Sequence, residues 1–143
     1  MAAAAIDAAT PTTDEAIAQA TQIAAACDTI EALDDAVRRF DACGLKSGAR
    51  NTVFFDGTKQ APLLVIGEAP GRDEDTTGKP FVGRAGQLLD RMLGSIDCDR
   101  EKNTLISNVI FWRPPGNRTP TQAETLICRP FCLLYTSPSP RDS

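Results

Sequence analysis

The most constraining feature of this sequence is a glycine-rich segment, residues 67–86 (GEAPGRDEDTTGKPFVGRAG), which lies between two apolar stretches. The first stretch, residues 62–66 (PLLVI), has the length and composition of a buried β-strand. In the second, apolar side chains recur at helical spacing over residues 85–93. A strand, a glycine-rich loop and a helix in this order predict a ligand site at the carboxyl end of a strand in an open α/β sheet.

The rest of the chain alternates predicted helices and strands. Apolar spacing predicts helices over 13–26 and 30–40, with Thr12 among the N-cap candidates of the first and Thr29 opening the second. Thr121, with Glu124 as its capping-box partner, is the predicted N-cap of a helix to about residue 131. Strands are predicted over 51–55, closed by a turn at 56–57, and over 104–111. This order predicts an α/β fold, a three-layer αβα sandwich with a central parallel sheet. The sheet is expected to be incomplete at the C-terminal end, because too few strands follow.

Charge is distributed unevenly along the 143 residues. The net charge is −4, yet residues 1–37 hold seven acids and no Lys or Arg, and the remainder holds 15 bases against 12 acids. A negative net charge therefore does not exclude a nucleic-acid partner, because electrostatic attraction of the partner depends on the charge of the face that it approaches. We expect an Ala-rich helical extension over 1–37, a main domain over 38–131 and a tail over 132–143.

The tail has two interpretations. In residues 133–143 (LLYTSPSPRDS) an apolar helical pattern changes abruptly to Ser, Pro, Arg and Asp. Either this is a disordered end, or the native sequence stops near Phe131 and the remainder is foreign, since it is similar to translated sequencing adaptor. We favour the second interpretation.

Cysteine usage and the N-terminus indicate a compartment. Five cysteines, an odd number without a CxxC pair, argue against a disulfide framework. The Ala-rich N-terminus has no preceding basic residue, which a secretory signal requires, and no apolar stretch approaches the length of a membrane span. The sequence predicts a cytoplasmic monomer without a membrane partner.

Each motif also has a plainer explanation. The GEAPG turn could be only a tight turn, but it matches neither common phosphate-loop pattern, and residues 73–75 (DED) would repel phosphate. Those acids could be a solvated charge run, or they could raise one another's pKa and position a water. The residue types do not choose between these alternatives.

Three further positions carry the same ambiguity. Phe81 could be a core residue or a platform for a flat ligand. Asn108, in an apolar strand, could bond to backbone, or it could read the polar edge of a flat ligand by accepting at its amide oxygen and donating from its amide nitrogen. Arg113 and Arg118 could contact phosphates or lie on a solvated surface.

Taken together, residues 67–93, 106–124 and 128–131 resemble the uracil-DNA glycosylase superfamily, specifically its bacterial and archaeal family 4 enzymes. The resemblance implies base-excision repair of uracil-containing DNA, in which the N-glycosidic bond of a flipped-out uracil is hydrolysed. It implies catalytic roles for Glu68 and Glu74, the latter also excluding a 5-methyl group or binding the base edge. It implies uracil binding by Glu68, Ala69, Phe81 and Asn108, and DNA binding by Arg113 and Arg118.

The chain departs from this family at two places. The family holds a four-iron four-sulfur cluster through four cysteines, of which only Cys43 and Cys128 are matched, with Phe40 and Trp112 at the other two positions. We therefore expect no cluster and expect the two aromatic side chains to pack in its place.

The second departure concerns turnover. The family has a His-containing motif in its C-terminal half, and this sequence contains no His. We expect an N-terminal fragment that is weak or inactive as a glycosylase. A uracil-DNA binding module without turnover is the alternative, and a small-molecule nucleotide enzyme is a third.

Overall fold

The computed structural model describes residues 11–136, which form two compact units. The first unit comprises the chain up to Gly44 and from Thr121, and the second comprises Leu45–Pro120. The domain boundaries expected at residues 37 and 131 stay predictions.

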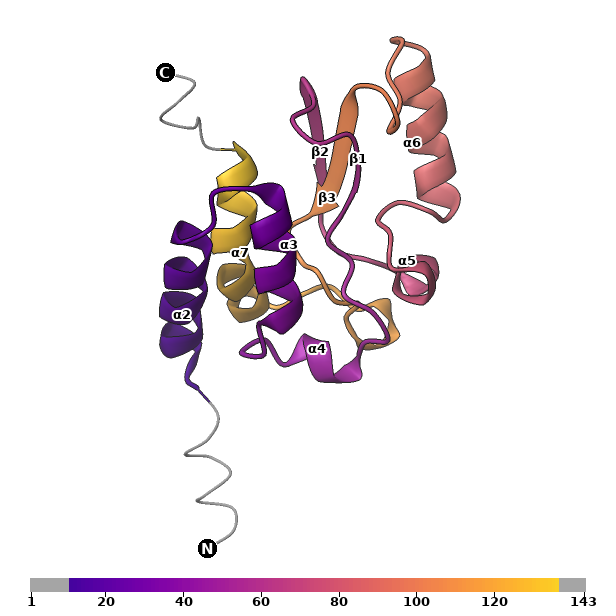
Figure 1. Ribbon diagram of the computed structural model, residues 1–143. Coiled ribbons are helices and arrows are strands. Elements are labelled where there is room, and N and C mark those ends of the chain that lie inside the picture. The colour runs from indigo at the N-terminus through magenta and orange to yellow at the C-terminus, as the bar shows by residue number, and fades with distance from the viewer. Residues whose placement is uncertain (1–10, 137–143) are drawn as a thin grey trace, which may run out of the picture. The chain divides into compact units, whose positions relative to one another are not determined.

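The first unit contains three helices, α2 (Thr13–Ala25), α3 (Ile30–Arg39) and α7 (Gln122–Thr136). Thr12 and Thr29 cap α2 and α3, each hydroxyl accepting a backbone hydrogen bond of 3.1 Å three residues on. Helix α2 packs against α7 and α3, as Figure 1 shows. It buries alanines at a spacing of four, Ala16, Ala20 and Ala24.

Helix α7 begins as predicted and ends later. Thr121 and Glu124 form the expected capping box, each side chain accepting from the backbone N–H of the other, at 3.1 and 2.9 Å. The expected end near Phe131 is wrong, since the helix continues to Thr136 and includes Pro130. Residues 137–143 of the expected tail, and residues 1–10 of the expected extension, lie outside the described residues.

The second unit contains a sheet of three strands, β1 (Phe55–Gly57), β2 (Leu63–Gly67) and β3 (Thr104–Asn108), in the order β1-β3-β2. Strands β2 and β3 are parallel, as expected, and β1 is antiparallel to β3. The prediction of a wholly parallel sheet is therefore wrong at β1. The fold class is mixed α/β.

Strand β1 also differs from its predicted bounds. Residues 56–57, expected to be a turn, are paired with β3, and β3 itself ends at Asn108 rather than at residue 111. Gly57 has φ +118°, and a side chain there would collide with the carbonyl oxygen of Thr104. The Asp-Gly pair is thus a close strand contact that resembles a turn signal in the sequence.

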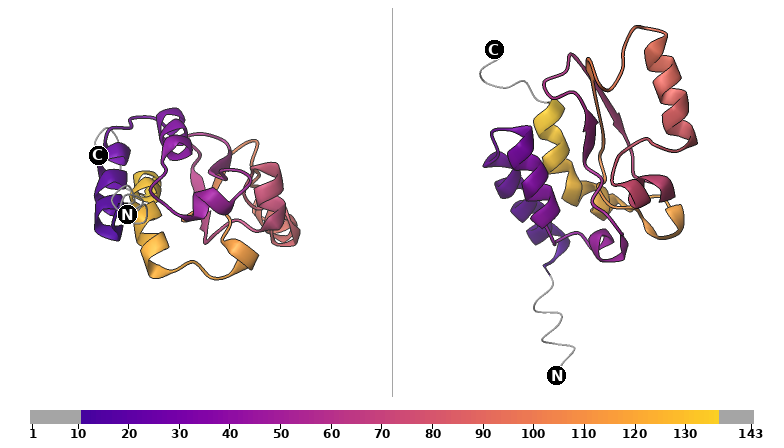
Figure 2. Two further views of the ribbon diagram at one scale, coloured as in Figure 1. Left: turned by 90° about the horizontal axis from the view of Figure 1, so that it is seen from below. Right: turned by 45° about the vertical axis from the view of Figure 1, so that its right-hand side comes forward.

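The helices of this unit are α4 (Leu45–Gly48), α5 (Arg72–Thr77), α6 (Arg84–Gly94) and the 3-10 turn η1 (Pro115–Asn117). Figure 1 and the right-hand view of Figure 2 show α5 and α6 on the same side of the sheet. Strand β3 is buried throughout, whereas β2 is half-buried along its length. None of the helices within residues 11–136 has the length and apolar character needed to cross a membrane.

Candidate uracil site

The site begins where two parallel strands end together. Gly67 at the end of β2 is the register partner of Asn108 at the end of β3. Beyond β3 the chain continues beside the glycine-rich loop, because Val109 and Ile110 donate backbone hydrogen bonds of 3.0 Å to the carbonyls of Gly67 and Glu68. This register brings Asn108 to the GEAPG turn from 41 positions further along the sequence.

Gly67, Phe81 and Asn108 converge at this edge of the sheet. A methyl group on Gly67 would collide with the ring of Phe81 and with Oδ1 of Asn108. The absent side chain of Gly67 is therefore what allows the ring and the amide to lie close together.

The side-chain oxygen of Asn108 has an unmet hydrogen-bonding capacity. Asn108 is only 2% exposed, and its Oδ1 is buried without a hydrogen-bond partner. A buried carbonyl oxygen without a donor costs about 1 to 3 kcal/mol. The alternative in which this oxygen bonds to backbone is excluded. A ligand N–H would satisfy the oxygen.

Phe81 has an unusual backbone conformation. Its φ is +55°, in the left-handed region that bulky residues rarely adopt. The turn is crowded, because a side chain on Gly86 would collide with the backbone of Phe81. Such strain persists only when surrounding contacts hold it, and it is most common at functional sites.

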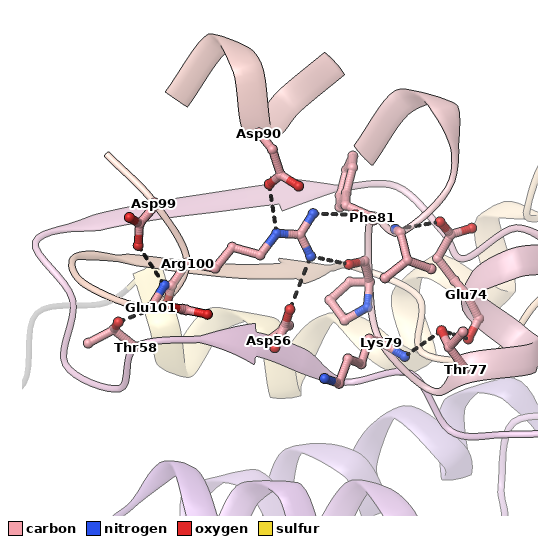
Figure 3. Close-up of polar contacts among 12 residues, drawn as sticks. Asp56, Thr58, Glu74, Thr77, Lys79, Phe81, Asp90, Asp99, Arg100 and Glu101 are labelled. Atoms are coloured by element: carbon pink, nitrogen blue, oxygen red, sulfur yellow. Dashed lines mark hydrogen bonds and ion pairs between the residues drawn. The ribbon is translucent and has the colours of Figure 1, made fainter. Parts of the chain in front are cut away.

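Arg100 supplies several of those contacts, as Figure 3 shows. Its Nη1 donates to the carbonyl of Pro80 at 2.7 Å, and its Nη2 donates to the carbonyl of Phe81. The same guanidinium pairs with Asp56 of β1 at 3.1 Å and with Asp90 of α6 at 2.9 Å. Arg100 thus ties the Phe81 turn to a strand and a helix.

Glu74 holds the same turn from its other side. One carboxylate oxygen accepts from the N–H of Val82 and of Gly83, both at 2.9 Å, and the other accepts from Gly71 N–H at 2.9 Å. Burial alone would raise the pKa of Glu74, but the backbone hydrogen bonds to its carboxylate, those from Val82 and Gly83 foremost, together outweigh burial and lower the pKa. The expectation that neighbouring carboxylates raise one another's pKa is wrong for Glu74.

The other two acids of the DED run differ in their burial. Asp75 is buried, and its Oδ1 accepts from the backbone N–H of Arg50 at 2.8 Å and of Asn51 at 3.1 Å. Asp73 is exposed. Helix α5, which the sequence did not predict, directs Asp75 away from the other two acids, whereas the carboxylates of Asp73 and Glu74 both lie beside Gly83. The run is therefore not a wholly solvated face.

The remaining predicted site residues lie on the loops that flank this edge. Glu68 follows β2 with an exposed side chain, and Ala69 beside it is half-buried. Arg113 donates to Asn117 Oδ1 at 2.7 Å, across a turn in which Gly116 and Asn117 both have positive φ. The catalytic, uracil-binding and DNA-binding roles expected of these residues stay predictions.

Comparison with known proteins decides the family. Residues 54–134 match the uracil DNA glycosylase superfamily, and the match spans more than half of the chain. The chain belongs to this superfamily.

Three relatives within the superfamily are each named type-4 uracil-DNA glycosylase. The Archaeoglobus fulgidus protein is 47% identical over 107 residues, which are 73% of this chain and 53% of the relative. The Thermotoga maritima protein is 41% identical over 106 residues, 74% and 55% of the two chains. The Saccharolobus solfataricus protein is 40% identical over 104 residues, 73% and 48% of the two chains. The chain spans about half the length of these curated relatives.

The cysteines of this superfamily member do not form a recognisable metal site. Cys43 and Cys128 are both buried in the first unit. Among residues 11–136, no group of three or more His, Cys, Asp or Glu side chains is arranged to hold a metal ion. A four-iron four-sulfur cluster ordinarily takes four ligands, and Cys43 and Cys128 match only two of the family's four positions.

The aromatic residues at the two unmatched ligand positions are core residues of their own units. In the first unit, Phe40 makes an edge contact with Phe131, with ring centroids 5.2 Å apart. In the second, Trp112 donates from Nε1 to Thr52 Oγ1 at 2.9 Å and makes an edge contact with Phe111. Both side chains are buried and pack against other aromatic rings, as hydrophobic core residues do.

Sequence reasoning missed the residues that hold the Phe81 turn. Arg100 lies in a strongly charged stretch, residues 97–102 (DCDREK), which is typical of an exposed loop. Its acidic partners are 10 and 44 positions away. No local pattern links these residues, so only the folded chain brings them together.

Proposed function

We propose that this protein acts as a uracil-DNA glycosylase in base-excision repair, hydrolysing the N-glycosidic bond of uracil flipped out of DNA. The observation that carries the proposal is the buried, unpartnered Oδ1 of Asn108 beside the ring of Phe81. The names of the relatives support it.

The recognition chemistry follows from the two polar atoms of one amide. Asn108 Oδ1 accepts from uracil N3–H, and its Nδ2 donates to uracil O4. Cytosine presents the reverse pattern and leaves both groups unsatisfied, at a cost of about 1 to 3 kcal/mol each. Uracil stacked on Phe81 gains about 1 to 3 kcal/mol, which offsets part of the cost of flipping the base from the duplex.

Entry of the base requires a local movement. Asn108 Oδ1 is shielded from solvent, and the ring of Phe81 is its neighbour across Gly67. We expect the ring to turn about its side-chain torsions, while its backbone stays held, so that the base lies between ring and amide. The Glu68–Ala69 backbone then borders the base, and Arg113 and Arg118 contact the DNA phosphates.

We also propose that the three-stranded sheet belongs to a three-layer αβα sandwich, and that the protein acts as a cytoplasmic monomer on uracil-containing DNA. Phe40 and Trp112 support the proposal that no iron–sulfur cluster is bound, because both are packed as core.

A uracil-DNA binding module without turnover is the second candidate. The observation that favours it is Glu74, whose two carboxylate oxygens both accept from backbone N–H groups. A carboxylate held this way stabilises a loop and is poorly placed to take a proton from water. If the protein does turn over uracil-DNA, as the first candidate requires, exposed Glu68 is the acid that we propose orients the attacking water.

Fluorescent single strands that contain one uracil separate the two candidates. Released uracil and an alkali-labile abasic site indicate the glycosylase, and retarded mobility without release indicates the binding module. A matched thymine strand is the control. Neither release nor retardation with the 143-residue chain would count against both candidates.

The variant Asn108→Asp tests whether the amide of Asn108 recognises the polar edge of uracil. A carboxylate accepts at both oxygens, so it cannot donate to uracil O4, and we expect the preference for uracil over cytosine to fall at least tenfold, about 1.4 kcal/mol. Unchanged selectivity would show that Asn108 does not discriminate uracil from cytosine.

A further inference from the structure

We propose that Arg100 is a positioning residue for base recognition, which fixes the backbone of Phe81 so that its ring faces Asn108. The inference rests on the proposed function, in which uracil stacks on Phe81. It extends the site to a side chain that does not itself contact the base.

The guanidinium of Arg100 is hydrogen-bonded through all three of its nitrogens. Arg100 donates four hydrogen bonds, from Nε to Asp90, from Nη1 to Asp56 and Pro80, and from Nη2 to Phe81. Its side chain is 13% exposed. Two successive carbonyls aimed at one planar fork are a geometry that Arg satisfies and that the single nitrogen of Lys does not.

The left-handed backbone conformation of Phe81 has to be held by surrounding contacts. Two successive carbonyls, of Pro80 and Phe81, accept from the guanidinium, and the chain has the left-handed conformation at Phe81. Released from these bonds, a Phe residue favours φ below zero. That change would re-aim the Cα–Cβ bond and carry the ring away from Gly67 and Asn108.

The guanidinium of Arg100 is itself held in place by two acidic side chains. Asp56 lies on β1 and Asp90 on α6, so the guanidinium is held from two elements before it meets the loop (Figure 3). Glu74 fixes the next two residues, Val82 and Gly83, through their N–H groups. Phe81 therefore lies between two clamps, and the one on its own carbonyl is Arg100.

The test compares Arg100→Met, Arg100→Lys and Phe81→Ala, with the double variant of Arg100→Met and Phe81→Ala, in the full chain. Affinities for a uracil-containing single strand and a matched thymine strand are measured by fluorescence anisotropy. Arg91→Met is the matched control, because Arg91 is exposed on α6 and carries the same charge. Urea unfolding of every variant measures stability separately.

We expect Arg100→Met to lower affinity for the uracil strand between about fivefold and about 150-fold, the range for loss of one stacked base. Affinity for the thymine strand should stay within about twofold, as should both affinities of Arg91→Met. Arg100→Lys should not restore uracil affinity. Once Phe81 is Ala, removing Arg100 should cost little more, because the two residues act through one ring.

Several results would overturn the inference. The inference fails if Arg100→Met keeps its affinity for the uracil strand, or if Arg100→Lys restores that affinity fully. It also fails if the affinity losses of Arg100→Met and Phe81→Ala add in the double variant. Each result would show that Arg100 only stabilises the fold. If Arg100→Met does not fold, Arg100→Lys carries the same test, because it keeps a positive charge beside Asp56 and Asp90.

A measurement independent of DNA separates this inference from the proposed function. The Cα and Cβ chemical shifts of Phe81 report its backbone conformation, and Arg100→Lys should move them toward ordinary extended or helical values. Unmoved shifts would refute the role of Arg100. A wild-type chain that binds uracil and thymine strands equally would refute the proposed function instead, whatever the shifts show.

Discussion

At the scale of single residues, the candidate site depends on a position that has no side chain. We predict that Gly67→Ala lowers uracil affinity at least tenfold, about 1.4 kcal/mol, because the methyl group displaces the Phe81 ring and the Asn108 amide. Overpacking should also lower the free energy of unfolding by about 1 to 3 kcal/mol. Anisotropy and urea unfolding measure the two effects.

Gly94→Ala is the matched control for that substitution. It lies at the end of α6, and a methyl group there would meet no atom within 4 Å. Unfolding free energy should stay the same or rise by up to about 1 kcal/mol, and uracil affinity should not change. Equal behaviour of the two glycine variants would contradict the packing described around Gly67.

Glu74 gives a prediction that depends on pH. Its pKa is lowered on folding, because the backbone hydrogen bonds to its carboxylate, those from Val82 and Gly83 foremost, together outweigh the opposing effect of burial. The stability it contributes is therefore complete above its unfolded pKa of about 4.3 and is lost as pH falls through the lower folded value. Glu74→Gln should unfold at lower urea concentration than wild type at pH 7, and the difference should shrink below about pH 4.

Asp73→Asn is the control for the pH experiment. Asp73 is the exposed neighbour of Glu74 in the same acidic run. Its substitution should leave the urea midpoint within experimental error at both pH values. A Glu74→Gln difference that persists undiminished at low pH would show that the carboxylate charge is not what holds the turn.

Residue types predicted part of this site and could not predict the rest. Phe81 and Asn108 were candidates from their motifs, and the structure brings them together beside Gly67. Glu74 was assigned chemistry, whereas its observed contacts are with backbone. Arg100 carried no signal, because a surface Arg and a buried one look alike until their partners are placed.

At the scale of elements, helix α6 shows that an apolar stripe need not be buried. The predicted stripe is present in the helix, but Leu88 and Met92 are 51% and 59% exposed, while Leu93 is 4% exposed. We predict that Leu88→Gln and Met92→Gln each change the free energy of unfolding by less than about 0.5 kcal/mol. Leu93→Ala should cost about 2 to 5 kcal/mol.

Urea unfolding of the three α6 variants measures these differences. The comparison is internal, since all three residues lie on one helix and are apolar. A loss above about 1.5 kcal/mol for either Gln variant would mean that this face is covered in solution.

Local signals predicted helix starts better than strand pairing. Thr12, Thr29 and Thr121 cap their helices as expected, because a cap depends on residues three positions apart. Strand β1 was misplaced, since its direction and bounds depend on pairing with β3 almost 50 positions away. The end of α7 was missed because the change of composition after Phe131 was interpreted as the end of the native sequence.

At the scale of the whole molecule, metal content is the clearest prediction. We expect the purified chain to bind far less than one iron per chain and to show no absorbance band in the visible blue, because Phe40 and Trp112 are packed as core. Colorimetric iron analysis after anaerobic reconstitution with iron and sulfide measures this. Cys43→Ser and Cys128→Ser should leave the result unchanged. Brown protein with about four irons per chain would refute it.

By itself, the sequence determined the family, the helix caps and the residue types of the candidate site, because each depends on a short run of neighbouring residues. Only the tertiary structure decided how those residues act. It placed Asn108 against Gly67 through parallel pairing, and left its oxygen without a partner. It turned Glu74 into a backbone clamp and brought Arg100 to the Phe81 turn. These contacts join residues far apart in the chain, and hydrogen bonds between such residues exist only once the chain has folded.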